Sequence, residues 1–397
     1  MIPILKGIRI IDVTAVILGP YAAQILGDLG ADVIKIEPPE GDSMRPIAPL
    51  AANGLSHIFA NNNRNKRSVC LDLKSEGGKA ALRALIPTGD VLMHNMRQDA
   101  LDKLGFSFEA VRKLHPRIIY CAANGYGRDG PYAGRPAYDD VIQAASGVAG
   151  LFQLRDGEAR YIPSIVADKV TGLHLAYGVL ASLLHRERTG EVPGYVEIPM
   201  FETMVAFALN EHMAEASWGA AETSGYARVI SADRKPYRTK DGFIGVLPYS
   251  EDKWRKVLGE LGLSHVTEEP WFQNTTERSS RIGELYAMLT GALPSRTTAE
   301  WCATFMRLDV PHSPVNMPAQ LLRDPHLNAV GFFETAFDAA TPMRRNLRAP
   351  VLFGGLEKSA DHPPPNLGQH TDEVLAEVGL SATDIAAAKP RRKANAS

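Results

Sequence analysis

The chain has 397 residues, of which 45% are hydrophobic and 22% charged, and a formal net charge of −2 at pH 7. This length suggests two or three domain-sized units, and so small a charge gives no global attraction to nucleic acid or to an anionic membrane. Three cysteines without CxxC spacing indicate a reducing compartment rather than structural disulfides. No signal peptide or long apolar stretch is visible, so we expect a cytoplasmic location.

The N-terminal segment predicts a strand–helix–strand unit. Ile8–Val13 is a short apolar run typical of a buried strand, Tyr21–Leu29 has the pattern of a helix, and Ala31–Glu37 predicts a second strand. Such a unit is typical of a parallel sheet. The turn TAVILGPYA carries one glycine where the dinucleotide fingerprint needs three, so we do not expect an NAD or FAD site.

Four further segments predict strands of the same sheet. They are Ser68–Leu73, Asp90–His94, Arg117–Ala123 and Tyr195–Ile198. A compact basic cluster, Arg64, Lys66 and Arg67, lies at the start of the first of them. Such a cluster is most often a solvated face, and the alternative is a phosphate-binding site.

A long loop follows the predicted strand at Arg117–Ala123. Its sequence, NGYGRDGPYAGRPAYDD, is rich in glycine and proline. Loops after parallel strands are where such sheets bind ligands, so we expect this loop to contribute to a site. The small apolar residues of Val141–Leu151 then predict a buried helix.

The pattern between residues 161 and 188 centres on Asp168. Tyr161–Val166 predicts a short extended segment, and a helix with one apolar face follows. That face consists of Val170, Leu173, Tyr177, Leu180 and Leu184. Asp168 lies where the helix should begin, which favours an N-cap whose carboxylate accepts backbone N–H groups. The same carboxylate, held ionised at a helix N-terminus, could also attack an activated acyl group, and the two interpretations are compatible.

From about residue 216 the composition changes and predicts a second, smaller domain. Thr239–Gly242 is typical of a hairpin turn, with a strand at Phe243–Leu247 and a helix at Asp252–Leu261 after it. Glu211–His212 lacks the HExxH spacing, so we expect no zinc site.

Several segments, in this order along the chain, match one known family. They are LKGIRIIDVTAVILGPYAAQILGDLGADVIKIEPPEGD, NRNKRSVCLDLK, GYGRDGPYAGRPAYDD, ADKVTGLHLAYGVLASL, PYRTKDGFI, DPHL and LGQHTDEVL. Together they resemble the family III CoA-transferases, of the formyl-CoA transferase and carnitine-CoA transferase type.

The resemblance implies an α/β fold with a large, doubly wound, Rossmann-like domain around a parallel sheet. Residues 1–215 and 329–397 would form this domain, with a disordered basic tail, and residues 216–328 would form an inserted, smaller α+β domain. Two chains would interlock as a homodimer. The implied activity moves CoA from an acyl-CoA thioester to a free carboxylic acid. CoA is then a substrate, and no other cofactor, metal, nucleic acid or membrane is expected.

Residue by residue, the ADKVTG motif implies that Asp168 is the nucleophile and forms a covalent aspartyl intermediate. The positions that would contact the acyl-CoA belong to the first strand–helix turn, a later strand end, two basic positions near CoA phosphates, and the active-site loop. In chain order they are Val16, Ile17, Asn95, Met96, Lys103, Arg135 and Tyr138.

The sequence departs from the formyl-CoA type at two places. Pro38 stands where those members carry an arginine, and Val246–Trp254 contains no run of glycines. A formyl or oxalyl substrate pair is therefore not implied. The related racemases share the fold and move an α-proton with a histidine, which here falls on Tyr138, whose phenol has an ordinary pKa near 10. A racemase-type isomerase and a non-catalytic acyl-CoA-binding protein are the alternative functions.

Overall fold

The computed structural model of the chain describes residues 1–219, 224–336 and 344–390. Two compact units divide it. The first comprises Met1–Val148, Tyr161–Phe207 and Phe332–Ser397, and the second comprises Ala149–Arg160 and Ala208–Gly331. The sequence placed the smaller domain at 216–328 and did not assign Ala149–Arg160 to it. Most of the predicted basic tail lies outside the described residues.

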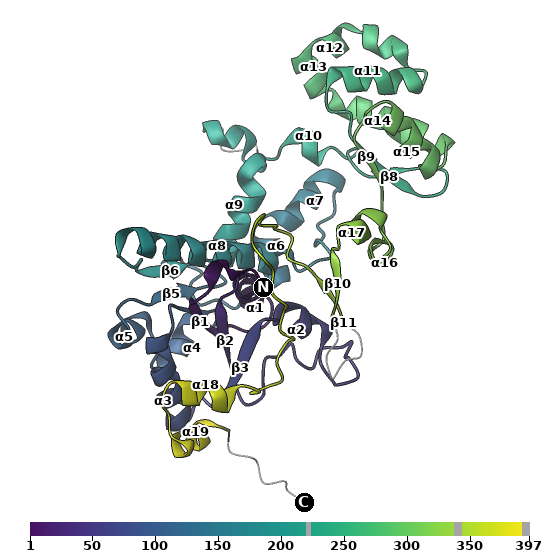
Figure 1. Cartoon of the computed structure of the whole chain (residues 1–397). Helices are drawn as coiled ribbons and strands as arrows, with labels where there is room; N and C mark the ends of the chain where they lie inside the picture. The colour runs from purple at the N-terminus through teal and green to yellow at the C-terminus, as the bar shows by residue number, and fades with distance from the viewer. Residues whose placement is uncertain (220–223, 337–343, 391–397) are drawn as a thin grey trace, which may run out of the picture. The chain divides into compact units, whose positions relative to one another are not determined.

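The first unit is built on a six-stranded parallel sheet with the order β3-β2-β1-β4-β5-β6 (Figure 1). The strands are β1 (Arg9–Val13), β2 (Asp32–Glu37), β3 (Lys66–Cys70), β4 (Val91–His94), β5 (Ile119–Ala122) and β6 (Tyr195–Glu197). Every neighbouring pair is parallel. This order is that of a doubly wound dinucleotide-binding sheet, and it confirms the predicted fold class.

Helices cover both faces of the sheet. On one face, α1 (Leu18–Asp28) and α8 (Val166–Thr189) pack against each other. On the other, alternate strand residues such as Ile11, Ile34 and Leu92 pack with apolar side chains of several helices. These are α3 (Glu76–Leu85), α4 (Gln98–Lys103), α5 (Phe108–Leu114), α18 (Thr371–Glu377) and α19 (Ala382–Ala388).

The two ends of the chain meet in the first unit. Helix α19 packs on α3, and Figure 1 shows both C-terminal helices beside this early helix. The backbone N–H of Cys70 donates to the hydroxyl of Thr371 at 3.0 Å. The remaining elements of this unit are η1 (Pro3–Leu5), α2 (His57–Asn62), η2 (Ile86–Thr88), α6 (Asp139–Ala145), and the antiparallel pair β10 (Phe333–Ala336) and β11 (Arg344–Leu347). Helices α7 (Val148–Asp156) and α9 (Met200–His212) each begin in it.

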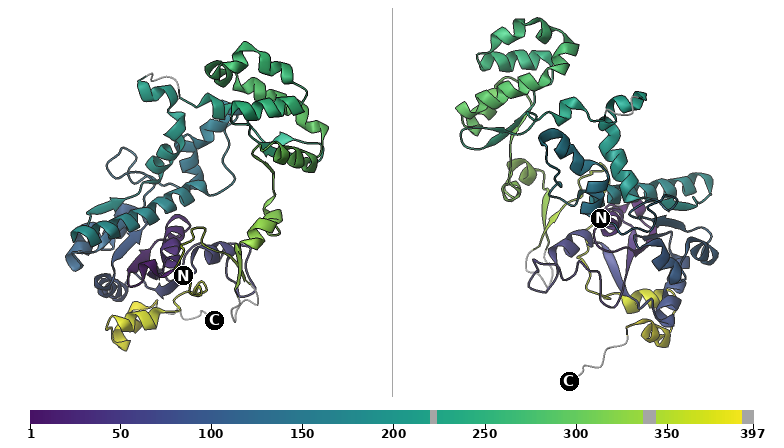
Figure 2. Two further views of the ribbon diagram at one scale, coloured as in Figure 1. Left: turned by 45° about the horizontal axis from the view of Figure 1, so that its top comes forward. Right: turned by 180° about the vertical axis from the view of Figure 1, so that it is seen from behind.

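The second unit has its own core. Three antiparallel strands, β7 (Tyr237–Arg238), β8 (Phe243–Val246) and β9 (His312–Pro314), pack with helices around buried aromatic residues that include Trp254, Phe272 and Trp301. The helices of this region are η3 (Ala214–Trp218), α10 (Ala227–Ile230), α11 (Glu251–Glu260), η4 (Ser264–Glu268), α12 (Pro270–Gln273), α13 (Thr275–Ser280), α14 (Ile282–Ala292), η5 (Leu293–Ser295), α15 (Thr298–Arg307), α16 (Pro318–Leu321) and α17 (Pro325–Ala329). Figure 2 shows the same elements from two further sides.

Two predictions about local structure were wrong. The predicted helix Val141–Leu151 is two helices, α6 and α7, because Gly147 adopts a left-handed backbone with a φ of 91°. The predicted extended segment Tyr161–Val166 contains no strand, and α8 begins at Val166.

The basic cluster at the start of β3 is neither a solvated face nor a phosphate site. Arg64 pairs with Asp28, and Lys66 pairs with Asp12 at 3.2 Å, and both basic side chains are buried. Arg67 contacts Asp32, Glu373 and Glu377. These pairs hold β3 to α1, β1, β2 and α18, so the cluster is structural.

Candidate active site

A pocket of about 280 Å³ lies at the carboxyl ends of β1, β4 and β5. The strand order reverses between β1 and β4, and such a reversal is where doubly wound sheets bind ligands. The lining comprises Ala15, Val16 and Leu18 after β1, Asn95, Met96 and Arg97 after β4, Ala123–Tyr126, Arg128 and Gly134–Tyr138 after β5, and Asp168 and Met200.

Most of the residues singled out from the sequence lie together in this pocket. Val16, Asn95, Met96, Arg135, Tyr138 and Asp168 all line it. Two do not. Ile17 is buried at the start of α1, and Lys103 is exposed at the end of α4, outside the lining. The amide of Asn95 exchanges two hydrogen bonds with the backbone of Ala15, at 2.9 and 2.8 Å, so this side chain supports the pocket wall.

Asp168 lies in the first turn of α8, but it is not the N-cap. Ile165 occupies the cap position and makes no side-chain cap. The free backbone N–H of Asp168 instead donates to the carboxylate of Asp139, on α6, at 3.0 Å. The sequence interpretation of Asp168 as a cap was therefore wrong, since a carboxylate from another helix satisfies this end of α8. The Asp168 carboxyl is left to face the pocket.

A glutamine fixes Asp139 from the other side. Gln143 Nε2 donates to the second carboxylate oxygen of Asp139 at 2.6 Å, and Gln143 Oε1 accepts the N–H of Ile162 at 2.8 Å. Asp139 and Gln143 are both buried. The segment before α8 and the start of α8 are thus held by two side chains one turn apart on α6.

Burial raises the pKa of the Asp168 carboxyl to about 7, with a smaller contribution from the negative charge of Asp139. Among the residues that the structure describes, no hydrogen bond is donated to this carboxylate. Its charge is therefore poorly compensated, which makes it more basic than an ordinary aspartate. About half of it is ionised near pH 7.

Helix α8 presents its predicted apolar face away from the core of its own chain. Leu173, Tyr177 and Leu184 are each about half exposed, at 49%, 59% and 52%. The buried face instead carries Ala167, Thr171, Gly172, Leu175, Ala176, Val179, Ser182 and Leu183. Small residues dominate it because α8 packs closely on α1. The apolar face predicted from the spacing is therefore not the face that packs on the core of this chain.

The loop that closes one side of the pocket is fixed by hydrogen bonds. The N–H of Gly127 donates to Glu202 at 3.0 Å, and the N–H of Arg128 donates to Glu197 at 2.9 Å. Tyr126 also packs against Tyr132 and Phe201. Glu197 and Glu202 come from β6 and α9, so the loop is braced by the elements that follow Asp168.

Three arginines and one acid line the pocket. Among the described lining residues, Arg97, Arg128 and Arg135 are basic, and Asp168 is the one acid. The guanidinium of Arg135 stacks over Tyr132 at 4.2 Å, and that of Arg128 over Tyr195 at 4.8 Å. A pocket of this charge suits a ligand with several negative charges.

Three residues of this region were not predicted from the sequence: Arg97, Arg128 and Asp139. Arg97 and Arg128 follow predicted strands within a few residues, and this position was the available signal, because ligands bind beyond the carboxyl ends of parallel strands. Asp139 gave no such signal, since its contact with Asp168 joins residues 29 positions apart.

The described residues contain neither a metal-ligand cluster nor a membrane-spanning helix. No three His, Cys, Asp or Glu side chains there are grouped so that they could hold a metal ion. Nor is any helix in that part of the chain long and apolar enough to cross a membrane.

The chain matches a known protein family over most of its length. The model of CoA-transferase family III matches residues 5–371. The succinate–glutarate CoA-transferase of Agrobacterium fabrum is 31% identical over 395 residues, which cover 95% of this chain and 96% of the relative. The probable fatty acyl-CoA transferase Rv3272 of Mycobacterium tuberculosis is also 31% identical, with 94% of this chain and 97% of the relative covered.

Solved structures agree with these relatives. A crystal structure of a mutant of Rv3272 matches with a TM-score of 0.82 and 31% identity, covering 94% of this chain and 98% of that one. A CAIB/BAIF family protein from Brucella suis matches with a TM-score of 0.80 and 29% identity, covering 95% of this chain and all of that one. The family match and the shared fold extend over nearly the whole chain, and the curated relatives are named CoA-transferases. The chain belongs to CoA-transferase family III and is a CoA-transferase.

Proposed function

We propose that this enzyme moves CoA from an acyl-CoA to a free carboxylic acid through covalent intermediates on Asp168. A carboxylate oxygen of Asp168 attacks the thioester carbonyl, the C–S bond breaks, and CoA leaves as a thiolate. The product on the enzyme is a mixed anhydride. The thiolate then attacks the Asp168 carbonyl of that anhydride, which releases the donor acid and leaves an aspartyl-CoA thioester.

The second half of the cycle reverses these steps with another acid. The acceptor carboxylate attacks the carbonyl of the aspartyl-CoA thioester and expels the CoA thiolate. This step joins the acceptor to Asp168 in a second anhydride. The thiolate then attacks the acceptor's carbonyl in this anhydride. The new acyl-CoA is released, and the Asp168 carboxylate is regenerated on the enzyme. Each step is an acyl transfer, so we propose CoA as a substrate and no additional cofactor.

The observation that carries this proposal is the Asp168 carboxyl on the wall of a pocket where the other charged residues that the structure describes are arginines. The carboxylate has lost much of its hydration, which raises its basicity and favours nucleophilic attack. Arg97, Arg128 and Arg135 offer partners for the phosphates of CoA. A limited supply of water at Asp168 would also protect an anhydride from hydrolysis.

The test is to trap the intermediate. The enzyme is mixed with a panel of acetyl-, succinyl-, glutaryl- and long-chain acyl-CoA, treated with hydroxylamine, and analysed by intact-mass and peptide-mass spectrometry. We expect a hydroxamate on Asp168 with at least one donor and no adduct in Asp168→Ala. Asp140→Asn is the matched control, because Asp140 is an exposed acid on α6, next to Asp139.

Two results would reject the covalent route. One is full CoA transfer by Asp168→Ala. The other is exchange of deuterium into a branched acyl-CoA with no adduct and no transfer, which is the outcome that a racemase-type isomerase gives.

We also propose that the working enzyme is a homodimer. The half-exposed face of α8 formed by Leu173, Tyr177 and Leu184 supports this, because apolar side chains at helical spacing gain stability when a partner surface covers them. A second copy of this chain is the proposed partner, and interlocking is the arrangement that the family resemblance implies.

A further inference from the structure

The turn between β1 and α1 has an unusual backbone at Val16. This residue has a φ of 71°, in the left-handed region. A β-branched side chain rarely adopts that region, so surrounding contacts must hold it there. Ala15 and Val16 line the pocket that contains Asp168. The strained residue therefore forms part of the binding wall.

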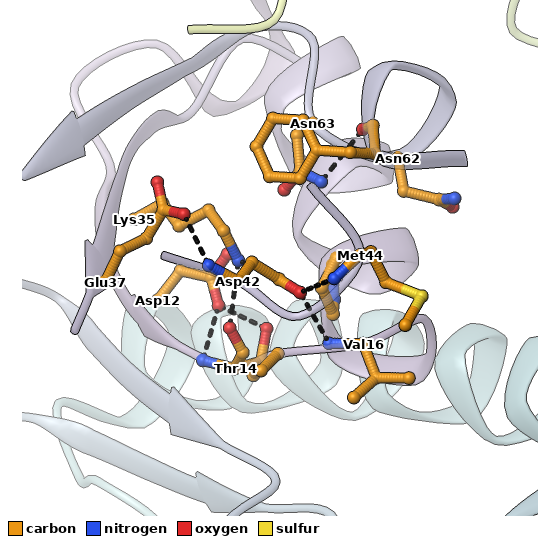
Figure 3. Close-up of polar contacts among 12 residues, drawn as sticks. Asp12, Thr14, Val16, Lys35, Glu37, Asp42, Met44, Asn62 and Asn63 are labelled. Atoms are coloured by element: carbon orange, nitrogen blue, oxygen red, sulfur yellow. Dashed lines mark hydrogen bonds and ion pairs between the residues drawn. The ribbon is translucent and has the colours of Figure 1, made fainter. Parts of the chain in front are cut away.

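Side chains from three other segments hold this turn, and Figure 3 shows two of them, Asp42 and Lys35. Asp42 Oδ1 accepts the N–H of Val16 at 3.3 Å, and the ammonium of Lys35 donates to the carbonyl of Thr14 at 3.0 Å. Asn95 exchanges its pair of hydrogen bonds with Ala15. Consecutive backbone groups of the turn are thus bonded to side chains rather than to other backbone groups.

Asp42 is itself held firmly. Lys35 Nζ donates to Asp42 Oδ2 at 2.9 Å, and both side chains are almost fully buried. The N–H of Asp42 donates to Glu37 at 3.0 Å, and Asp42 Oδ1 also accepts the N–H of Met44 at 3.0 Å. Burial by itself lowers the pKa of the Lys35 ammonium, but attraction to Asp12, Asp42 and Glu37 raises it above its ordinary value, so Lys35 stays charged.

We propose that Asp42, fixed by Lys35, is a positioning residue for CoA binding, and that it acts by holding Val16 in its left-handed conformation. This rests on the proposed function, since the ligand is CoA. The side chain of Asp42 does not line the pocket, and its effect on the ligand passes through the backbone of Val16.

A purely structural role for the buried charges makes a different prediction. Asp28 provides the comparison. Like Asp42 it is a buried carboxylate with a basic partner, here Arg64, but it lies at the far end of α1 from the turn. If buried pairing alone matters, loss of either carboxylate lowers stability and leaves ligand affinity unchanged. If Asp42 positions Val16, only its loss weakens the binding of CoA.

Glycine supplies the second comparison. It adopts a positive φ without strain, so Val16→Gly removes the need for a side chain to hold the turn. The dissociation constant of free CoA is measured by titration calorimetry, and the Tm by calorimetric scanning, for the wild type, Asp42→Ala, Val16→Gly, the double variant and Asp28→Asn.

We expect Asp42→Ala to weaken CoA binding about tenfold, which corresponds to about 1.4 kcal/mol. Adding Val16→Gly to Asp42→Ala should tighten CoA binding again by about threefold or more. The Tm should stay low, because Lys35 still lacks the Asp42 carboxylate. Asp28→Asn should lower the Tm and keep the CoA affinity within about twofold of the wild type. Should Asp42→Ala not fold, Asp42→Asn with and without Val16→Gly makes the same comparison.

Wild-type affinity in the Asp42 variant overturns the inference, and so does a loss of affinity that Val16→Gly does not reduce. Failure of the wild type itself to bind CoA contradicts the proposed function instead, so the two can be told apart.

Discussion

The carboxylate of Asp139 accepts the backbone N–H of Asp168 at 3.0 Å, and two acidic residues therefore meet at the first turn of α8. Asp139 satisfies a free N–H group at the helix end, and its negative charge raises the pKa of the neighbouring carboxyl. One contact thus serves both the local fold and the chemistry of the pocket.

The pH dependence of transfer should follow the ionisation of Asp168. Only the carboxylate is a nucleophile, so kcat/KM for the acyl-CoA should fall as the pH drops through about 7, the pKa that burial and Asp139 produce. Asp139→Asn removes the neighbouring negative charge. The midpoint of the pH dependence of kcat/KM should then move to lower pH by roughly half a unit to one unit. A pH–rate profile of both forms is the measurement. A flat profile between about pH 5.5 and pH 8 would contradict it.

The same carboxyl should make folding stability depend on pH. Its pKa is about 7 in the folded chain and near 3.8 when unfolded, so the protonated form is favoured by folding. The associated stability is present below about pH 4 and is lost as the pH rises to about 7. Asp168→Asn, which is neutral throughout, should therefore be more stable than the wild type above pH 7, by on the order of 4 kcal/mol.

Urea unfolding of the wild type and Asp168→Asn at about pH 8 and pH 4.5 measures this difference. The difference in unfolding free energy between the two proteins should be smaller at the lower pH. Asp140→Asn, an exposed substitution, serves as the control and should show no such change. Equal unfolding free energies of the wild type and Asp168→Asn at pH 8 would mean that the ionised Asp168 carboxylate does not destabilise the fold.

The strands of the sheet could be predicted from the sequence because each is a short apolar run bounded by turn residues. The strand predicted at Ala31–Glu37 corresponds to β2, and that at Asp90–His94 to β4, within one residue. The carboxyl-end loops then placed most of the pocket, since their position follows from the parallel arrangement. Val16, Asn95, Met96 and Arg135, which the family resemblance implied as contacts, lie in these loops.

The contacts that joined distant segments could not be predicted. Apolar spacing in α8 marks residues that avoid water, but it does not say whether the chain's own core covers them, and Leu173 and Tyr177 are half exposed. Basic residues at the start of β3 resemble a surface cluster until their partners are known, and Glu373 and Glu377 lie about 300 positions away from Arg67. Burial of charge depends on such tertiary partners, which local patterns do not encode.

Arg135 should contribute to CoA affinity, whereas Lys103 should not. Arg135 lines the pocket and Lys103 is exposed outside it. Loss of a charge-assisted contact with a phosphate should raise the KM for acyl-CoA about tenfold in Arg135→Ala. Lys103→Ala also removes a positive charge, and its KM for acyl-CoA should stay within about twofold of the wild type. Steady-state kinetics at two salt concentrations measure both, and a larger effect for Lys103→Ala would place the phosphates outside this pocket.

The exposed face of α8 should decide the oligomeric state. Glutamate at Leu173 and Tyr177 places charge in the middle of the proposed contact between two copies, so Leu173→Glu/Tyr177→Glu should sediment as a monomer. Leu114→Glu is the control, because Leu114 is also exposed but lies on α5. Analytical ultracentrifugation measures the mass. A doubly substituted chain with the same mass as the wild type would exclude this face as the interface.

The close packing of α8 on α1 should be sensitive at one glycine and tolerant at another. A Cβ added at Gly172 would lie 2.7 Å from the carbonyl oxygen of Leu18, whereas one added at Gly178 would come no closer than 3.8 Å to any neighbour. Gly172→Ala should therefore push the two helices apart and cost about 1–3 kcal/mol of unfolding free energy. It should also lower kcat, because Asp168 lies one turn earlier on the same helix. Gly178→Ala replaces glycine by a better helix former without a clash, so it should be neutral or stabilising by up to about 1 kcal/mol. Urea unfolding and steady-state kinetics of the two variants test this, and equal unfolding free energies would mean that the contact at Gly172 is not what positions α8.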